Sequence, residues 1–334
     1  MRRLYSSLSA LATALDRVVA LEARVGLAYD AVASKWAPCR MRVGLEERNM
    51  TKKLTIPDLL QSVADGQPLS MITCYDHPSA QIIDRAGVDI VLVGDSVAMT
   101  VLGYPNTLPA TMDLMIPFAG AVARGCQRAF VIGDMPYMSY QISTEAAIGN
   151  AGRFMAEAGV DGVKLEGGRS MAERVRGITH AGIPVMGHLG LTPQSASAIG
   201  GYKVQGRGGE AAIGLLEDAL ALQEAGVFAI LLELVPARVA AIISERLDVP
   251  TISIGSGAQC SGHCQIFHDA IGMFDAFVPR HAKQYASVGK VIAEAMDGFV
   301  ADIQSGAYPG PEHSFKVDRE TLRALQAHVE ARGN

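Results

Sequence analysis

The sequence predicts a single (βα)8 barrel of the α/β class, with an N-terminal extension before it. Beyond residue 66, short β-branched runs alternate with longer amphipathic stretches, the pattern of a parallel sheet with crossover helices. Eight such units follow one another, more than an open doubly wound sheet normally holds. In addition, no dinucleotide-binding glycine motif follows the first strand. A closed barrel fits all three observations.

The expected elements alternate regularly along the chain. Glycine follows alanine at the ends of several expected helices, and glycine readily adopts the left-handed conformation that terminates a helix. These Ala-Gly pairs lie at 86/87, 158/159, 181/182 and 225/226. The expected strands are 69–76, 88–96, 129–135, 162–168, 184–190, 227–235, 251–257 and 275–280, and clear helical spacing occurs at 79–86, 143–158, 209–225 and 237–247.

Residues 1–49 form an expected extension, and residues 50–334 form the barrel domain. The extension is rich in Ala, Leu and Arg, and strand-like runs begin only after Met50. Three interpretations are open: a targeting peptide, an added helix, or a start codon set upstream of the true one. Acidic residues within the extension argue against a transit peptide, so we favour a poorly anchored helix or tail.

The composition restricts the partners of the protein. A net charge of −5 and a pI near 5.9 argue against nucleic acid or an anionic membrane surface. Charged residues interrupt every apolar stretch before it reaches the ~18 residues of a membrane span. Five scattered cysteines predict a reducing cytoplasm rather than a disulfide framework. Cys260 and Cys264 flank His263, but no second cysteine pair completes a zinc set, so we interpret this segment as a loop.

Polar residues end five successive strands that are otherwise apolar. In a barrel enzyme the chemistry lies at the carboxyl ends of the strands. Each residue alone has an ordinary structural explanation, such as a helix cap or an ion pair. A purely structural role is harder to accept for polar residues at the ends of five successive strands. The residues are Asp95 and Ser96, Asp134, Lys164 and Glu166, His188, and Glu233.

Asp95 and Asp134 end neighbouring strands, which lie ~4.8 Å apart, so both carboxylates can reach one cation. A few oxygen ligands suit Mg²⁺ better than Zn²⁺. Lys164 and Glu166 are two residues apart on one strand and therefore face the same side. We expect Lys164 to hold an anionic group of the substrate and Glu166 to hold a metal-bound water.

Glu233 ends the very apolar run 227–235, where burial would raise the pKa of its carboxyl group. Such a carboxylate is a competent proton acceptor near neutral pH. A metal, a lysine and an isolated glutamate together predict deprotonation of a 2-oxo acid beside its carbonyl, with the metal as Lewis acid. The residues do not identify the electrophile.

Several blocks resemble those of the ketopantoate hydroxymethyltransferases, in the family order from about residue 52 to Phe315. The blocks are VLVGDSVAMTVLGYPNTLPAT, GDMPYMSY, KLEGG, VMGHLGLTPQ, GGYKVQGRG, LLELVP and GAYPGPEHSF. The resemblance implies a barrel of the phosphoenolpyruvate/pyruvate superfamily and a homo-oligomer, commonly a decamer of five dimers. It also implies site residues by position: Asp95 and Asp134 as Mg²⁺ ligands with Glu166 beside the metal through water, and Ser96, Asp134, Lys164 and His188 at the 2-oxo acid.

The reaction implied by the resemblance begins when Glu233 removes the C3 proton of 3-methyl-2-oxobutanoate. The resulting enolate attacks the methylene carbon of 5,10-methylenetetrahydrofolate and gives 2-dehydropantoate, on the way to pantothenate. Two rivals are a lyase or mutase of the same superfamily and a catalytically silent barrel. No cysteine lies in 187–209, where such lyases carry a catalytic loop, and the complete set of acids argues against a silent barrel.

Two features leave open questions. The glycine-rich segment 200–209 is either a mobile loop or a lid over the substrate. The chain also departs from the family pattern where folate contacts or subunit packing would be affected. These departures are Ser256, Ser261, His263, Arg280 and His281.

Overall fold

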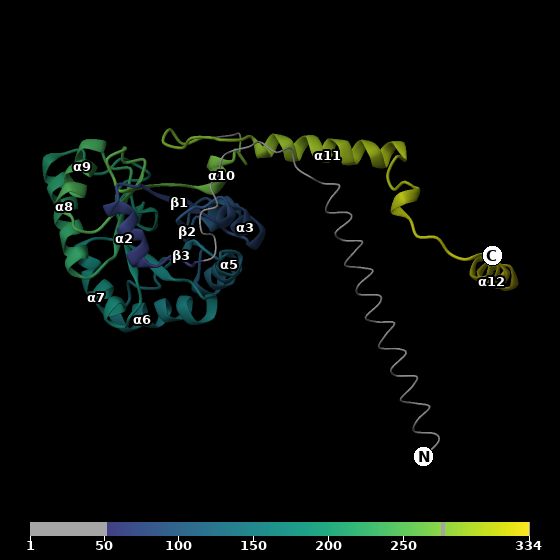
Figure 1. Cartoon of the computed structure of the whole chain (residues 1–334), viewed down its shortest axis with the longest axis horizontal. Helices are drawn as coiled ribbons and strands as arrows, with labels where there is room; N and C mark the ends of the chain where they lie inside the picture. The colour runs from purple at the N-terminus through teal and green to yellow at the C-terminus, as the bar shows by residue number, and fades with distance from the viewer. Residues whose placement is uncertain (1–51, 275–277, 334) are drawn as a thin grey trace, which may run out of the picture. The chain divides into compact units, whose positions relative to one another are not determined.

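The structure, a computed structural model, describes residues 52–274 and 278–333. Eight parallel strands form a closed barrel in chain order from β1 to β8 (Figure 1). The predicted fold class is therefore confirmed, whereas the predicted extension 1–49 lies outside the described residues. The strands are β1 Leu69–Thr73, β2 Ile90–Val93, β3 Phe130–Asp134, β4 Gly162–Glu166, β5 Val185–Gly190, β6 Ala229–Glu233, β7 Thr251–Ile254 and β8 Gly262–Gln265.

Helices connect the strands, and the four with clear spacing in the sequence lie where they are predicted. Glycines at positions 87, 159, 182 and 226 all have positive φ and follow the helix ends, as the Ala-Gly pairs predict. The helices are α2 Ile56–Ala64, α3 His77–Arg85, α4 Val97–Thr100, α5 Met112–Gly125, α6 Thr144–Arg153 with a π turn Phe154–Ala158, α7 Ala172–His180, α8 Gly209–Glu224, α9 Ala237–Arg246, α10 Phe267–Ala270, α11 Val288–Ser305 and α12 Arg319–Arg332; short 3₁₀ turns are Arg169–Met171, Pro193–Ser195 and Pro311–His313.

The eighth strand differs from the prediction. Residues 278–280 form no strand, and the barrel closes through Gly262–Gln265, which pairs with β1 and β7. The segment from Cys260 to Cys264, interpreted as a loop, thus contributes the first three residues of β8. The error has a physical reason: β8 is four residues long and contains no β-branched residue, so only its two-residue alternation marks it as a strand.

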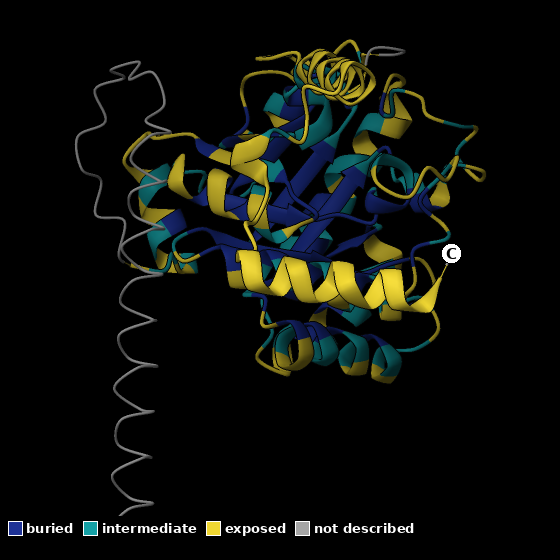
Figure 2. Cartoon of the chain, turned by 90° about the vertical axis from the view of Figure 1, so that its right-hand side faces the viewer, coloured by how far each residue is buried: buried dark blue, intermediate teal, exposed yellow. Residues whose placement is uncertain are grey.

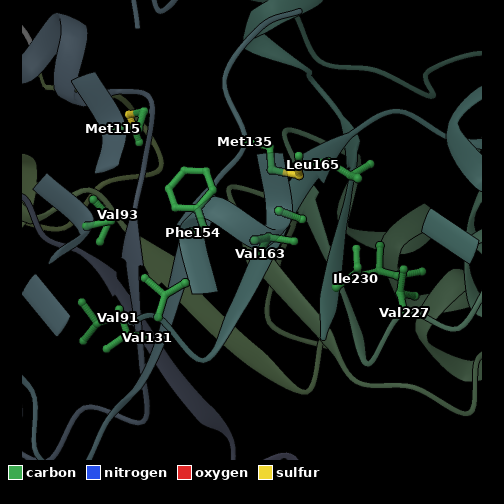
Figure 3. Packing of buried hydrophobic residues seen from close by; sticks show 14 of the residues in the cluster. Val91, Val93, Met115, Val131, Met135, Phe154, Val163, Leu165, Val227 and Ile230 are labelled. Carbon is green, nitrogen blue, oxygen red and sulfur yellow. The ribbon is translucent and has the colours of Figure 1, made fainter. Parts of the chain in front are cut away.

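Two apolar layers hold the barrel together. The outward side chains of the strands pack against the surrounding helices, as Val131 and Val163 do beside Phe154 (Figure 3). A second cluster fills the lumen, and Leu59 of α2 belongs to it, so α2 closes the amino-terminal end of the barrel. Both layers exclude water from the strands, and this burial stabilises the fold.

The lumen changes character along each strand. Phe130 and Ile132 of β3 belong to the apolar lumen cluster, and Asp134 follows them at the same two-residue spacing. Leu231 of β6 likewise precedes Glu233. The amino-terminal half of the lumen is therefore apolar and the carboxyl-terminal half carries the ionisable groups.

The last two long helices bury no residue within the described part of the chain. Helix α12 is exposed along its whole length, whereas the strands are buried (Figure 2). Among the described residues, no helix combines the length and the apolar character needed to cross a bilayer.

Candidate active site

A cavity of about 930 Å³ opens at the carboxyl ends of the strands. All the residues predicted from the strand ends line this one cavity. They are Asp95, Ser96, Asp134, Lys164, Glu166, His188 and Glu233. Because they come from five successive strands, the closure of the barrel brings them together.

Asp134 and Lys164 form a buried ion pair at the floor of the cavity. Lys164 Nζ lies 2.7 Å from Asp134 Oδ1, and each side chain is 3% exposed. The backbone N–H of Asp95 donates to Asp134 Oδ2 at 3.2 Å, which joins the end of β2 to the end of β3. A methyl group at Gly133 would lie 2.4 Å from the Phe154 ring, so only glycine lets β3 carry Asp134 here.

His188 lies between two glutamates. Its Nδ1 is 3.4 Å from Glu166 Oε1, and its Nε2 is 3.3 Å from Glu233 Oε2. Lys164 Nζ is 3.3 Å from the same Nδ1. Burial and the Lys164 charge lower the pKa of His188, but hydrogen bonds to Glu166 and Glu233 outweigh them and raise it to about 9. The raised pKa favours the protonated imidazole, and each of its two nitrogens faces one glutamate.

The acids repel one another. Burial raises the pKa of Asp95 well above its ordinary value, and the charges of Asp134 and Glu166 raise it further. Burial raises the pKa of Asp134 less, because the Lys164 ammonium opposes the rise. At the floor of the cavity, the carboxyl groups of Asp95, Asp134, Glu166 and Glu233 thus lie around two cationic side chains, Lys164 and His188. The excess negative charge favours a bound cation.

The oxygen atoms in this cavity fit a divalent cation completed by water and substrate. Asp134 Oδ1 and Glu166 Oε1 are buried and accept no well-aligned hydrogen bond. No group of three His, Cys, Asp or Glu side chains within residues 52–274 and 278–333 is placed to hold an ion alone. Magnesium commonly uses one or two carboxylates and several waters, so this donor set suits Mg²⁺.

Residues 53–311 match the family described as ketopantoate hydroxymethyltransferase. The chain belongs to this family. A 3-methyl-2-oxobutanoate hydroxymethyltransferase of Chloroflexus aurantiacus is 52% identical over 272 residues, 81% of this chain and 96% of the relative. The enzyme of the same name from Syntrophobacter fumaroxidans is 50% identical over 280 residues, which are 83% of this chain and 99% of the relative. The resemblance seen in the sequence is therefore confirmed.

A solved structure shares the fold with little sequence identity. Phosphonopyruvate hydrolase, crystallised with oxalate and Mg²⁺, aligns with a TM-score of 0.53 at 12% identity, over 84% of this chain and 97% of its own. This likeness shows the barrel architecture alone. Membership of the hydroxymethyltransferase family decides against the lyase or mutase alternative.

Several residues that contact the predicted site residues were not found from the sequence. Gln194 is 5% exposed, and its amide contacts Asp95 Oδ2 at 3.0 Å. The hydroxyl of Tyr140 contacts Gln194 Oε1 at 2.8 Å, and that of Tyr75 contacts Ser96 Oγ at 2.8 Å. Gln194 and Tyr140 lie in the family-like blocks GHLGLTPQ and GDMPYMSY, which was the available signal.

The mouth of the cavity is less polar than its floor. Tyr202 of the glycine-rich segment lines it together with Leu234 and Phe274. Leu234 follows Glu233 with a φ of +46°, and its carbonyl accepts a hydrogen bond from Gln205 N–H at 3.0 Å. The glycine-rich segment is thereby attached directly beside Glu233. Whether it moves as a lid stays a prediction.

The family departures divide into two groups by position. Arg280 and His281 line the cavity mouth. Ser261 and His263 do not line this cavity: Ser261 Oγ accepts from Thr251 N–H, and His263 is exposed on β8. Ser256 Oγ donates to the Leu232 carbonyl at 2.8 Å and thus joins β6 and β7 structurally. Only the first group is placed to contact a ligand.

Proposed function

We propose that the protein transfers a hydroxymethyl group from 5,10-methylenetetrahydrofolate to 3-methyl-2-oxobutanoate and produces 2-dehydropantoate, on the way to pantothenate. The observation that carries the proposal is the convergence of the predicted acids, lysine and histidine in one cavity of a member of this family. The curated relatives carry the corresponding name over nearly their whole length. A catalytically silent barrel would have no need to keep so many ionisable groups buried together.

In this proposal Asp95 and Asp134 hold Mg²⁺, with Glu166 beside it through water. When bound, the ion would supply positive charge beside the oxygens of the 2-oxo acid, where negative charge would develop during enolisation. Ser96 and Lys164 bind the oxo acid and orient it. The ammonium of Lys164 is suited to this role, since neighbouring Asp134, Glu166 and Asp95 outweigh its burial and raise its pKa.

Glu233 is the proposed base. It ends β6 on the lumen side, its side chain is 17% exposed, and it faces the cavity. Its backbone is held against β5: the Leu191 N–H donates to the Glu233 carbonyl oxygen at 2.8 Å, and Gly190 passes so close that a methyl group there would lie 2.1 Å from the same oxygen. Gly190 also has a φ of +93°, which other residues rarely adopt. The folate would enter through the mouth of the cavity beside Tyr202.

The decisive assay measures 2-dehydropantoate formed from 3-methyl-2-oxobutanoate and methylenetetrahydrofolate, with Mg²⁺ and after removal of metal by a chelator. We expect product only with both substrates, loss of turnover on chelation, and recovery when Mg²⁺ is returned. Absence of product at any Mg²⁺ concentration would contradict the proposal and favour a binding role.

We also propose that residues 1–49 are dispensable for the chemistry, since every residue assigned above follows Met50. A chain beginning at Met50 should fold and turn over like the full-length protein. Circular dichroism and the product assay test this expectation on the two chains side by side. If the shortened chain loses activity or folding, the extension contributes to the barrel or to its assembly.

Finally, we propose that the protein assembles with copies of itself, as a decamer. Helix α11 carries an exposed apolar stripe of Ile292, Met296, Phe299 and Ile303 at helical spacing. On the outer face of the barrel, Ser70 of β1 and His263 of β8 are exposed, whereas the outward side chains of the other strands are covered by helices. A cavity of about 430 Å³ lies at this exposed face. An apolar stripe and an uncovered sheet face on the same chain are typical of surfaces that cover one another between subunits.

Native mass spectrometry tests the assembly. We expect the parent protein to be a decamer and Phe299→Glu to dissociate it, because a charge on the stripe would be buried without a partner. Ala301→Glu adds the same charge on the opposite side of α11 and should leave the assembly intact. A monomeric parent, or equal dissociation by both variants, would show that the stripe is not an interface.

A further inference from the structure

The three buried acids of the cavity share a feature: each holds one carboxylate oxygen in a hydrogen bond. Asp95 Oδ2 accepts from the Gln194 side-chain amide at 3.0 Å. Glu166 Oε2 accepts from the Gln194 backbone N–H at 3.0 Å. Asp134 Oδ2 accepts from the Asp95 backbone. A single residue, Gln194, therefore holds two of the three acids, which come from different strands.

The orientation of the Gln194 amide follows from its partners. Its Nε2 lies 3.0 Å from the carbonyl oxygen of Met135, which can only accept, so the nitrogen rather than the oxygen faces that group and Asp95. Tyr140 O–H donates to Gln194 Oε1 at 2.8 Å from the other side. Tyr140 is itself 1% exposed. The amide is thus fully bonded and held in one orientation.

The second oxygen of two of these acids faces a cationic side chain: Asp134 Oδ1 lies 2.7 Å from Lys164 Nζ, and Glu166 Oε1 lies 3.4 Å from His188 Nδ1. Glu166 Oε1 and Asp134 Oδ1 accept no well-aligned hydrogen bond, and within the described residues no hydrogen bond reaches Asp95 Oδ1. Carboxylates this close repel one another and, without fixed donors, would turn apart. Donors that hold one oxygen of each acid keep the other oxygen directed toward the cavity.

We propose that Gln194 is the positioning residue of the cation site: it holds Asp95 through its side chain and Glu166 through its backbone, and Tyr140 fixes the direction of its amide. The inference rests on the proposed Mg²⁺ site and adds to it a residue that touches neither metal nor substrate. Such supporting groups typically change metal affinity by about 10- to 100-fold.

Metal binding without substrate tests the proposal. Mn²⁺ replaces Mg²⁺ as a probe because free Mn²⁺ is counted by electron paramagnetic resonance, and competition then gives the Mg²⁺ affinity. We expect Gln194→Met, which keeps the volume but removes the amide, to bind Mn²⁺ about 10- to 100-fold more weakly. Tyr140→Phe should lose less, because the amide remains and only its orientation is freed.

A matched control separates positioning from folding. Gln223 also uses its side-chain amide in several hydrogen bonds, to Asp248 and Val249, but it does not line the cavity. Gln223→Met should leave Mn²⁺ affinity unchanged even where it lowers the thermal midpoint. If Gln194→Met lowers the midpoint but keeps the parent affinity, Gln194 is structural and the proposal is overturned. If the parent binds no divalent ion, the proposed metal site is itself wrong, and the two failures are thereby distinguished.

Discussion

Replacement of Glu233 by glutamine is expected to collapse exchange of the C3 proton of 3-methyl-2-oxobutanoate with deuterated water. Glutamine preserves the shape of the side chain but cannot accept the proton. General-base assistance is typically worth about 10²- to 10⁴-fold, so we expect a loss of that size in exchange and in turnover. Exchange is followed by nuclear magnetic resonance in the presence of Mg²⁺ and without the folate, which isolates enolisation from group transfer.

Binding of the oxo acid is the internal control, because near-normal affinity with lost exchange identifies a base rather than a binding group. Glu224→Gln, an exposed change at the end of α8, controls for loss of a carboxylate elsewhere. His188 is the other candidate base in the cavity. Hydrogen bonds to Glu166 and Glu233 raise the pKa of His188 to about 9, and this direction disfavours it as a proton acceptor. Undiminished exchange in Glu233→Gln would nevertheless remove Glu233 from the mechanism and direct attention to His188.

The strand-end residues were predictable because a barrel strand alternates its side chains between lumen and helices. Asp134 and Glu233 interrupt apolar runs at lumen positions, and that interruption is visible in the sequence. Strand β8 was missed because its four residues are not apolar enough to register as a buried strand. The alternation of apolar and polar residues therefore located the site residues on the apolar strands, but it did not locate β8.

Gln194 shows a different limit of sequence reasoning. It lies in the short 3₁₀ turn Pro193–Ser195 that follows β5, and its partner Asp95 is 99 residues away in the chain. Neither the periodicity nor the composition of the sequence indicates that a side chain from the segment after β5 contacts the residue that follows β2. The same holds for Tyr140, whose hydroxyl meets Gln194 from the loop after β3. Contacts of this kind follow only from the closed barrel and the paths of its loops.

Replacement of Asp134 by asparagine is expected to abolish metal-dependent turnover. The change removes the charge of one proposed ligand and leaves the Lys164 ammonium without its 2.7 Å partner, so the ammonium would then repel the incoming cation. We expect no measurable product at Mg²⁺ concentrations that saturate the parent, and no stabilisation of the variant by Mg²⁺ in thermal unfolding, whereas the parent gains stability as the ion binds only the folded chain.

Asp161→Asn provides the matched control for this change. Asp161 also pairs with a lysine, Lys53, at 2.7 Å, but it accepts a hydrogen bond from Val131 N–H at the opposite, amino-terminal end of β3. Loss of this pair should lower the midpoint of unfolding and leave both turnover and the Mg²⁺-dependent stabilisation in place. If Asp134→Asn binds Mg²⁺ and turns over like the parent, Asp134 is only the counter-ion of Lys164, and the cation must be held by Asp95 and Glu166 instead.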